Sequence, residues 1–362
     1  MSILIKGNNG IGGSSGSGKG FPIGNVLNLK INNGSKNATI YWSDPDDSIY
    51  NNIILSTWSS TIIVRKEGSA PTSIKDGIII LENTERNKYK ETPYTDSNVE
   101  IGKTYYYRFY TVSTDKVYND SSDMIRNVTI KEYDPILKNN SWETINTVSE
   151  AGSIPETWNV GDEIDITLSG DFNETITLQI WDFNHYYGSA IDIGLVGICF
   201  GTKNLTSFKY NMNTASDSQG GWNNTYIRNY VMEDILKSMP SELRNRIQEV
   251  HTFANKGSGN TEGSYGLLSK DKVFLPGFTE IFGSDEDLGQ FKTEQNQSQF
   301  PIFTNNNSRI KKSNNGSGNA GAWWTRSPCY NDNGKFKSVG VGGSPSRNEA
   351  YDIIGICFCF NV

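Results

Sequence analysis

The segment Gly13–Gly20 of this 362-residue chain, GSSGSGKG, has nearly the spacing of a nucleotide-binding phosphate loop. A working loop also needs a buried strand before it, a helix after it, and Ser or Thr directly after the lysine to hold magnesium. Here a glycine follows Lys19, a Phe-Pro pair comes next, and only Ile3–Ile5 offers a preceding strand. We therefore interpret the segment as part of a flexible Gly/Ser-type arm and not as a nucleotide site.

The chain contains two histidines, His185 and His251. Neither lies in a G-x-S-x-G elbow or an H-E-x-x-H helix, the patterns that mark serine hydrolases and zinc proteases. His185 follows a predicted strand, and His251 ends a predicted helix. We interpret His185 as a hydrogen-bonded structural residue, with a catalytic role as the alternative.

Acidic and amide side chains gather in several loops. The carboxylate pairs Asp44–Asp47 and Asp285–Asp287 lie in polar stretches, so we expect solvated surface and not an acid/base pair. The stretch 331–334, NDNG, is rich in oxygen ligands but lacks the spacing and the closing Glu of a calcium loop. We predict no cofactor, and a weak calcium site remains open.

The composition excludes several classes of protein. The formal net charge is −7 with interspersed charges, which disfavours nucleic-acid binding. No apolar run is long enough to cross a bilayer, and the first residues lack the pattern of a secretory signal. The cysteines form no C-x-x-C pair and are too few for a disulfide scaffold, so we expect buried thiols at Cys199, Cys329, Cys357 and Cys359.

The elements of the first half are predicted to be short strands. Alternating apolar residues at 26–31 and 38–42 flank an Asn-Asn-Gly turn, which indicates a hairpin. Further strands are expected at 60–66, 77–82, 104–112 and 124–131. Short strands at this spacing predict an antiparallel sandwich.

The run Gly102–Val112 resembles the sixth strand of a fibronectin type III domain. The resemblance implies that Tyr105 makes the tyrosine corner of that family and that Trp42 is its core tryptophan. Tyr107 and Phe109 would point into the core, and the residues between and beside them would face outward. The resemblance covers 24–132 and implies a spacer or binding module without chemistry of its own.

A linker is predicted at 133–140, and a second domain at 141–362. Its first strands are expected at 160–168 and 174–181, and a helix at 226–236. A second helix is predicted from Pro240 onward, with Leu243, Ile247 and Val250 on one face.

Two apolar stretches in this second domain echo each other. AIDIGLVGICF at 190–200 and AYDIIGICFCF at 350–360 are both expected to be central strands buried on two faces. The second would close the core at the end of the chain, so a truncation there should be poorly tolerated.

Three ordered motifs carry a second resemblance. The patterns G-G-W…R, L-S-x-x-x-V and W-W-x-R-S-P resemble an uncharacterised domain family that recurs in bacteriophage tail proteins and in surface proteins of Gram-positive bacteria. That family looks related to the C-type-lectin-like fold. One departure is Tyr186, where the family tends to have an acidic residue after the histidine. The resemblance implies a scaffold role for Trp222, Arg228, Trp323, Trp324 and Arg326, and the calcium-lectin sugar motifs are absent.

Two irregular loops in this domain are rich in Asn, Asp, Ser, Arg and Tyr. Such side chains suit adaptable polar contacts around an aromatic anchor. An ordinary solvated loop is the alternative. The predicted ligand-binding residues are Tyr330, Asn331, Asp332, Asn333, Ser346, Arg347, Asn348 and Tyr351.

The sequence thus predicts a mainly β protein with a smaller α+β part: a Gly/Ser-rich attachment arm (1–23), a fibronectin III-like β-sandwich (24–132), a linker (133–140) and a C-type-lectin-like α+β domain (141–362). The resemblances imply a non-enzymatic structural or receptor-binding component of a phage tail or tail-like particle, assembled in the host cytoplasm. Its expected partners are other tail or baseplate proteins, further copies of itself and a host-surface glycan or protein. The alternatives are a cell-wall or glycan hydrolase and a bacterial surface adhesin.

Overall fold

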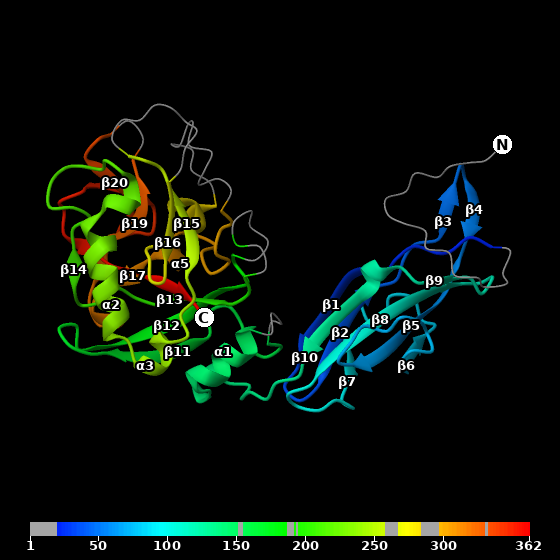
Figure 1. The fold of residues 1–362 in the computed structure, drawn as a ribbon. Helices are drawn as coiled ribbons and strands as arrows, with labels where there is room; N and C mark the ends of the chain where they lie inside the picture. The colour runs from blue at the N-terminus through cyan, green and yellow to red at the C-terminus, as the bar shows by residue number, and fades with distance from the viewer. Residues whose placement is uncertain are drawn as a thin grey trace. The chain divides into compact units, whose positions relative to one another are not determined.

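The computed structural model describes residues 20–150, 155–186, 192, 195–257, 267–283, 297–329 and 332–362. The chain divides into two compact units, and it passes from the first to the second between Tyr133 and Asp134. A short segment that ends at Thr157 also belongs to the first unit. Each unit is built mainly from β-strands (Figure 1).

The first unit is a sandwich of two antiparallel sheets. One sheet has the order β1-β2-β7 and the other the order β10-β8-β5-β6, with β9 paired to β8. The bounds are β1 (Leu27–Asn33), β2 (Ala38–Ser43), β5 (Trp58–Glu67), β6 (Ile78–Asn83), β7 (Tyr94–Asp96), β8 (Thr104–Ser113), β9 (Tyr118–Asn119) and β10 (Ile125–Thr129), with a 3-10 turn at Ser122–Met124. The predicted strands of this half are therefore confirmed, and a separate hairpin of β3 (Ser48–Tyr50) and β4 (Ile53–Ser56) adds to them.

The core of the sandwich forms where the two sheets face each other. Trp42 from β2 packs edge-on against Phe109 from β8, and Tyr107 lies in the same buried cluster. The hydroxyl of Tyr105 accepts a hydrogen bond from the backbone N–H of Glu100 over 3.1 Å, which is the contact of a tyrosine corner.

Two expectations for this unit are wrong. Arg108 and Tyr110 were expected to face outward, but both are buried because the chain after β5 covers that face, and Arg108 donates to the carbonyls of Pro71 and Thr72. Asp44 was expected to be solvated, but it is buried and accepts from Trp42 Nε1 over 2.9 Å and from Thr61 Oγ1 over 2.6 Å. The other pair, Asp285–Asp287, lies outside the described residues.

The second unit contains two larger sheets. One has the order β11-β12-β13-β23 and the other the order β14-β22-β19-β20-β21. The bounds are β11 (Glu163–Leu168), β12 (Glu174–Phe183), β13 (Ile198–Thr202), β14 (Lys209–Tyr210), β19 (Trp323–Pro328), β20 (Lys335–Val339), β21 (Pro345–Glu349), β22 (Ile354–Gly355) and β23 (Cys359–Asn361); two small ribbons pair β15 (Val250–Ala254) with β16 (Leu267–Asp271) and β17 (Lys311–Lys312) with β18 (Ala320–Gly321).

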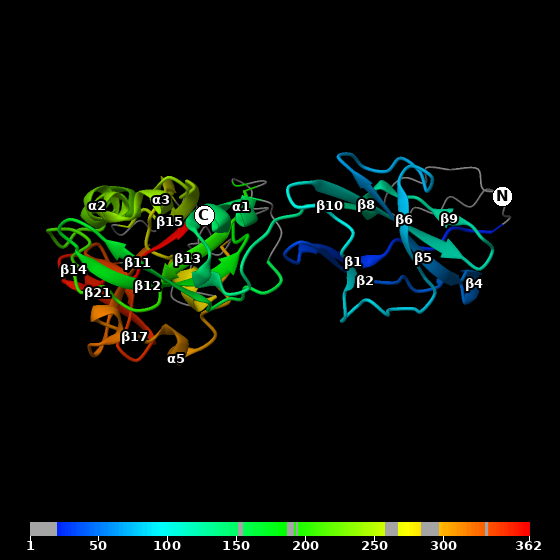
Figure 2. The ribbon, with the colours of Figure 1, turned by 90° about the horizontal axis from the view of Figure 1, so that it is seen from below.

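The helices of this unit are short. Figure 2 shows α2 and α3 on one side of the sheet that holds β11 and β12, and α5 with β17 on the other. The bounds are α1 (Trp142–Glu150), a π-helical turn (Ile227–Met232) leading into α2 (Glu233–Ser238), α3 (Ser241–Arg244), α4 (Phe278–Phe282) and α5 (Asn306–Arg309), with 3-10 turns at Leu137–Asn139, Gly221–Asn224 and Asn314–Gly316. No helix in the described parts of the chain is long and apolar enough to cross a membrane.

The helix predicted after Pro240 is shorter than expected. It ends at Arg244, and Val250 and His251 belong instead to β15, where they pair with Asp271 and Lys270 of β16. Val250 is buried as predicted, but the alternation of buried residues from Val250 to Ala254 follows the two-residue period of a strand.

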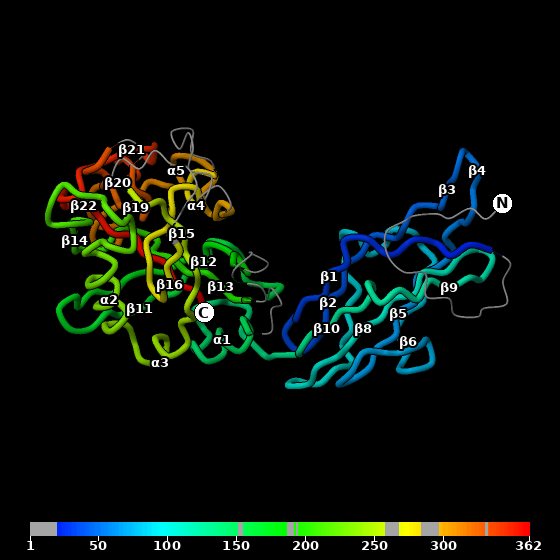
Figure 3. The backbone as a smooth tube through the Cα atoms, turned by 45° about the horizontal axis from the view of Figure 1, so that its top comes forward, coloured from blue at the N-terminus to red at the C-terminus, as the bar shows by residue number. Residues whose placement is uncertain are grey.

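Parts of the two echoing apolar stretches meet in one sheet, in which β13 is a central strand as predicted, whereas β23 is the last strand in the order and not a central one. β13 pairs antiparallel with β23, and Phe200 lies opposite Phe360. The last residue, Val362, is buried, and its carbonyl accepts from the N–H of Ile198 over 2.9 Å (Figure 3). The end of the described chain is therefore part of the core, and all four cysteine side chains are buried thiols as predicted.

The predicted linker, 133–140, contains buried residues. Tyr133 and Leu137 are each nearly inaccessible, and Asn140 Oδ1 accepts from the N–H of Asp134 over 2.7 Å. The N-terminal arm lies outside the described residues up to Lys19.

Candidate ligand-binding site

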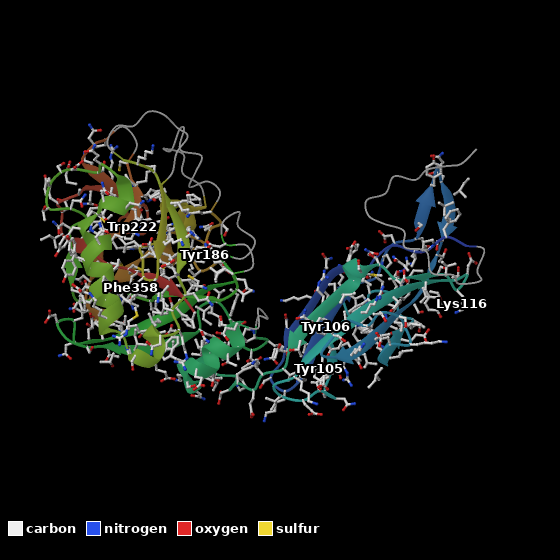
Figure 4. The ribbon with its side chains drawn as sticks, viewed as in Figure 1. Tyr105, Tyr106, Lys116, Tyr186, Trp222 and Phe358 are labelled. Carbon is white, nitrogen blue, oxygen red and sulfur yellow. The ribbon has the colours of Figure 1, made fainter. Side chains whose placement is uncertain are left out.

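Asp271 joins two of the sequence motifs in the interior of the second unit. Its carboxylate accepts from Trp222 Nε1 over 2.9 Å and from Arg228 Nε over 2.7 Å. Thr252 Oγ1 donates to the same carboxylate over 2.6 Å. These bonds fix the start of the π-helical turn to β16 (Figure 4, Trp222). Asp271 is the one carboxylate within the L-S-x-x-x-V motif at 268–273, and it is not among the predicted site residues.

Trp323 and Trp324 are both fully buried on β19. Their side chains point to opposite faces, since Trp323 Nε1 donates to the carbonyl of Arg309 and Trp324 Nε1 to that of Tyr210. The two tryptophans therefore anchor α5 on one side of the sheet and β14 on the other.

Arg326 is the centre of a buried polar network. Its guanidinium donates to the carbonyls of Phe253 and Leu275 over 2.9 Å each, and to Gln297 Oε1 over 2.8 Å. It also donates to Glu280 Oε2 over 2.7 Å. A rigid fork with five donors suits this role, because one side chain then satisfies oxygens from several chain segments.

His185 extends this network toward the surface. Its Nδ1 lies 2.7 Å from Asp182 Oδ2, its Nε2 lies 3.7 Å from Glu280 Oε1, and its ring stacks on Phe300 with the centroids 3.9 Å apart. Burial disfavours the imidazolium, but the two carboxylates outweigh it and raise the pKa of His185 to about 9. Burial likewise disfavours the Glu280 carboxylate, but Arg326 and His185 outweigh it and lower its pKa to about 2. The side chain of His185 is buried, as a structural residue requires.

The predicted ligand-binding residues lie on and beside the β20–β21 hairpin. Ser346 and Arg347 are exposed on β21, and Tyr351 is half exposed just beyond it. Asp332 and Asn333 lie just before β20, and Tyr351 lies just after β21. All three are at the same, open end of the hairpin, because Lys335 at the start of β20 pairs with Glu349 at the end of β21. Two of the predicted residues, Tyr330 and Asn331, lie outside the described residues.

Lys335 ties the two predicted loops together. Its Nζ lies 2.9 Å from Asp332 Oδ2 and 3.2 Å from Glu349 Oε1. Ser216 Oγ donates to the other oxygen of Glu349 over 2.7 Å. The N–H of Ser218 donates to the carbonyl of Asn333 over 2.8 Å.

Two side-chain hydrogen bonds fix Asn348. Its Oδ1 accepts from Ser338 Oγ over 2.8 Å and its Nδ2 donates to Asp352 Oδ2 over 3.1 Å. The exposed Arg347 and Tyr351 therefore project from a backbone whose neighbouring side chains are already fixed.

The weak calcium site was a hypothesis for the stretch 331–334, in which Asp332 is the carboxylate. Burial opposes ionisation of this carboxyl, but hydrogen bonds from Lys335 and from the N–H of Gly334 outweigh it and lower its pKa. Both carboxylate oxygens thus have protein partners. In the described part of the chain no group of three or more His, Cys, Asp or Glu could hold a metal ion.

Two exposed tyrosines outside the set of predicted ligand-binding residues lie near these loops. Tyr226 and Tyr230 are 38% and 60% exposed and stack with ring centroids 5.2 Å apart. Asn213 links them to the hairpin, because its N–H donates to the carbonyl of Ala350 and its Oδ1 accepts from the N–H of Tyr226. Their four-residue spacing on the polar face of the predicted helix is the sequence feature that could have indicated this exposed pair.

Comparison with known proteins gives a match for this unit. Residues 198–362 match the model of a family described as "Domain of unknown function (DUF6273)". A comparison with curated proteins gave no match. Among solved structures, the third fibronectin III domain of the human KIAA0343 protein is 16% identical, with a TM-score of 0.22, and the alignment covers 35% of this chain and 96% of that one. This TM-score is too low to bear on the fold, and the two-sheet arrangement of the first unit rests on its strand pairing.

Proposed function

We propose that the protein is a non-enzymatic structural or receptor-binding component of a phage tail or tail-like particle, and that the second unit, as a C-type-lectin-like domain, binds a host-surface glycan or protein. The proposal places the protein in a virion or an extracellular tail-like particle, assembled in the host cytoplasm in several copies. It needs no cofactor. The resemblance of the W-W-x-R-S-P motifs to phage tail and Gram-positive surface proteins motivates it.

One observation supports the binding part of the proposal. Exposed Arg347 and Tyr351 flank the ion pairs of Lys335 with Asp332 and Glu349. A fixed polar base beneath exposed aromatic and cationic side chains lowers the entropy lost on binding.

The test is saturable binding of the fluorescently labelled full chain to candidate host cells. Tyr351→Ala and Arg347→Ala should each weaken binding at least tenfold. Tyr118→Ala, an exposed tyrosine of the first unit, is the matched control and should leave binding unchanged. Equal affinities for all four proteins would contradict the assignment of the site.

A hydrolase is the second candidate, and one pair of residues favours it. His251 Nδ1 lies 2.8 Å from Asp192 Oδ1, and the His251 side chain is partly exposed. A positioned His–carboxylate pair is the arrangement of a general base. Turnover of purified host cell walls that His251→Gln abolishes would replace the binding proposal with this one.

A surface adhesin is the third candidate. Tail-tube, baseplate and lysis genes beside the gene would support a particle component, and anchoring of the protein to the producing cell would support an adhesin.

A further inference from the structure

The β3–β4 hairpin of the first unit is a two-stranded sheet, and in the described parts of the chain neither of its strands pairs with a third. Its turn residues Asn51 and Asn52 both have positive φ, 47° and 62°, as a tight two-residue hairpin turn requires. The stretch 48–56, SIYNNIILS, carries no charged side chain. Figure 1 shows the hairpin standing apart from the two sheets of the sandwich.

The hairpin exposes an unusual amount of apolar surface. Ile49, Ile53 and Ile54 are each 62% exposed, and Tyr50 is 48% exposed. Isolated two-stranded hairpins are marginal in water, and their open edges leave backbone donors and acceptors ready for another strand. Within the described residues the hairpin therefore has no third strand, and its isoleucines are largely uncovered.

The N-terminal arm reaches the sandwich at the end that bears this hairpin. Leu27 at the start of β1 pairs with Ser43 at the end of β2, and the chain continues from Ser43 into β3. A methyl group built on Gly24 would lie 3.5 Å from Pro45 Cβ, between β2 and β3. Gly24, close to the start of the described chain, therefore lies near the base of the hairpin.

The arm contains one short strand-like sequence. Ile3, Leu4 and Ile5 are its only consecutive aliphatic residues, and the following stretch to Gly20 is rich in Gly, Ser and Asn. A Gly/Ser-type chain of that length has a root-mean-square span of about 20 Å, and a three-residue strand is about 10 Å long. A tether of this kind gives its two ends an effective concentration on the order of millimolar.

We propose that Ile3–Ile5 adds to the β3–β4 hairpin of the same chain as a third strand. Backbone hydrogen bonds along the open edge would hold the segment, and its aliphatic side chains would cover the exposed isoleucines. Linkage within one chain is favoured over pairing between chains by the short tether. The proposal is independent of the function proposed for the second unit.

Hydrogen exchange of the full chain, followed by mass spectrometry, tests the pairing. Ile5→Asp places a charge against an apolar, uncharged hairpin, so amides in 48–56 should exchange at least tenfold faster than in the unaltered protein. Asn8→Asp adds the same charge to the same arm and should leave exchange unchanged. Equal exchange of the hairpin in the unaltered and Ile5→Asp proteins would overturn the proposal.

Cross-linking decides which chain supplies the strand. An Ile5→Cys, Ile54→Cys double variant, oxidised as a mixture of ¹⁵N-labelled and unlabelled copies, should give disulfides within single chains. Mixed-isotope disulfides would overturn the proposal in favour of exchange between copies. Hydrogen exchange of β5 and β8 in each variant checks that the sandwich is folded, since these two strands pair along most of their length in its larger sheet.

Discussion

Arg326 Nη1 lies 2.7 Å from Glu280 Oε2, and neither side chain is exposed to solvent. Both charges are removed from water, so each depends on the other and on the surrounding hydrogen bonds for its stability. The pair joins β19 to α4, and through His185 it also reaches the end of β12.

Arg326→Met should therefore lower the free energy of unfolding by about 3–5 kcal/mol, because it leaves the Glu280 carboxylate buried without its main partner. Urea denaturation measures the change. Arg347→Met replaces an exposed arginine in the same sheet and should alter stability by less than about 0.5 kcal/mol. A loss below about 1 kcal/mol in Arg326→Met would show that the pair is not a structural anchor.

His185 should make the stability of the second unit depend on alkaline pH. Its pKa in the folded protein is raised to about 9 from a usual value of 6.5, so its contribution is fully present below pH 6.5. As pH rises through 9 the folded protein loses this proton, and on the order of 3 kcal/mol of stability is lost with it.

Denaturation series between pH 6 and pH 10 measure this dependence. His185→Gln should flatten the decline, whereas His251→Gln should retain it. A decline of equal size in His185→Gln would assign the pH dependence to other groups.

The sequence predicted the strands of the first unit well because runs of β-branched and aromatic residues mark them and turn residues separate them. The two-residue period was less informative, since β5 and β8 are buried on both faces. The wrong predictions of solvent exposure in this unit have a common cause. Asp44, Arg108 and Tyr110 are buried by chain segments distant in sequence, and a local pattern does not record such cover. The same limit applies to Val250, whose burial suited either a helix or a strand until its pairing with Asp271 was known.

For the candidate site, the sequence indicated the residue types but not their partners. Lys335 brings Asp332 and Glu349 together through hairpin pairing, and no spacing rule gives that contact. The tyrosines at 226 and 230 lie near the hairpin only because Asn213 links two segments of the fold.

Asp271 should be the most sensitive position of the G-G-W and L-S-x-x-x-V motifs. Asp271→Ala leaves Trp222 Nε1, Arg228 Nε and Thr252 Oγ1 without this acceptor, which should cost about 3 kcal/mol or more. Asp271→Asn keeps an acceptor oxygen and should cost less. Chemical denaturation separates the two variants, and equal losses would mean that packing and not hydrogen bonding accounts for the effect.

Lys335 offers a way to separate preorganisation from stability. Its ion pairs with Asp332 and Glu349 are partly exposed, so Lys335→Ala should lower the free energy of unfolding by less than about 1 kcal/mol. The binding to host cells that we propose should nevertheless weaken several-fold, because the loops on either side of the hairpin lose their shared cation and must be ordered on binding. Lys337→Ala is unsuitable as a control because that lysine is buried, whereas exposed Lys209 on β14 offers one in the same sheet. Unchanged binding by Lys335→Ala, together with weakened binding by Tyr351→Ala, would show that Tyr351 binds without this support.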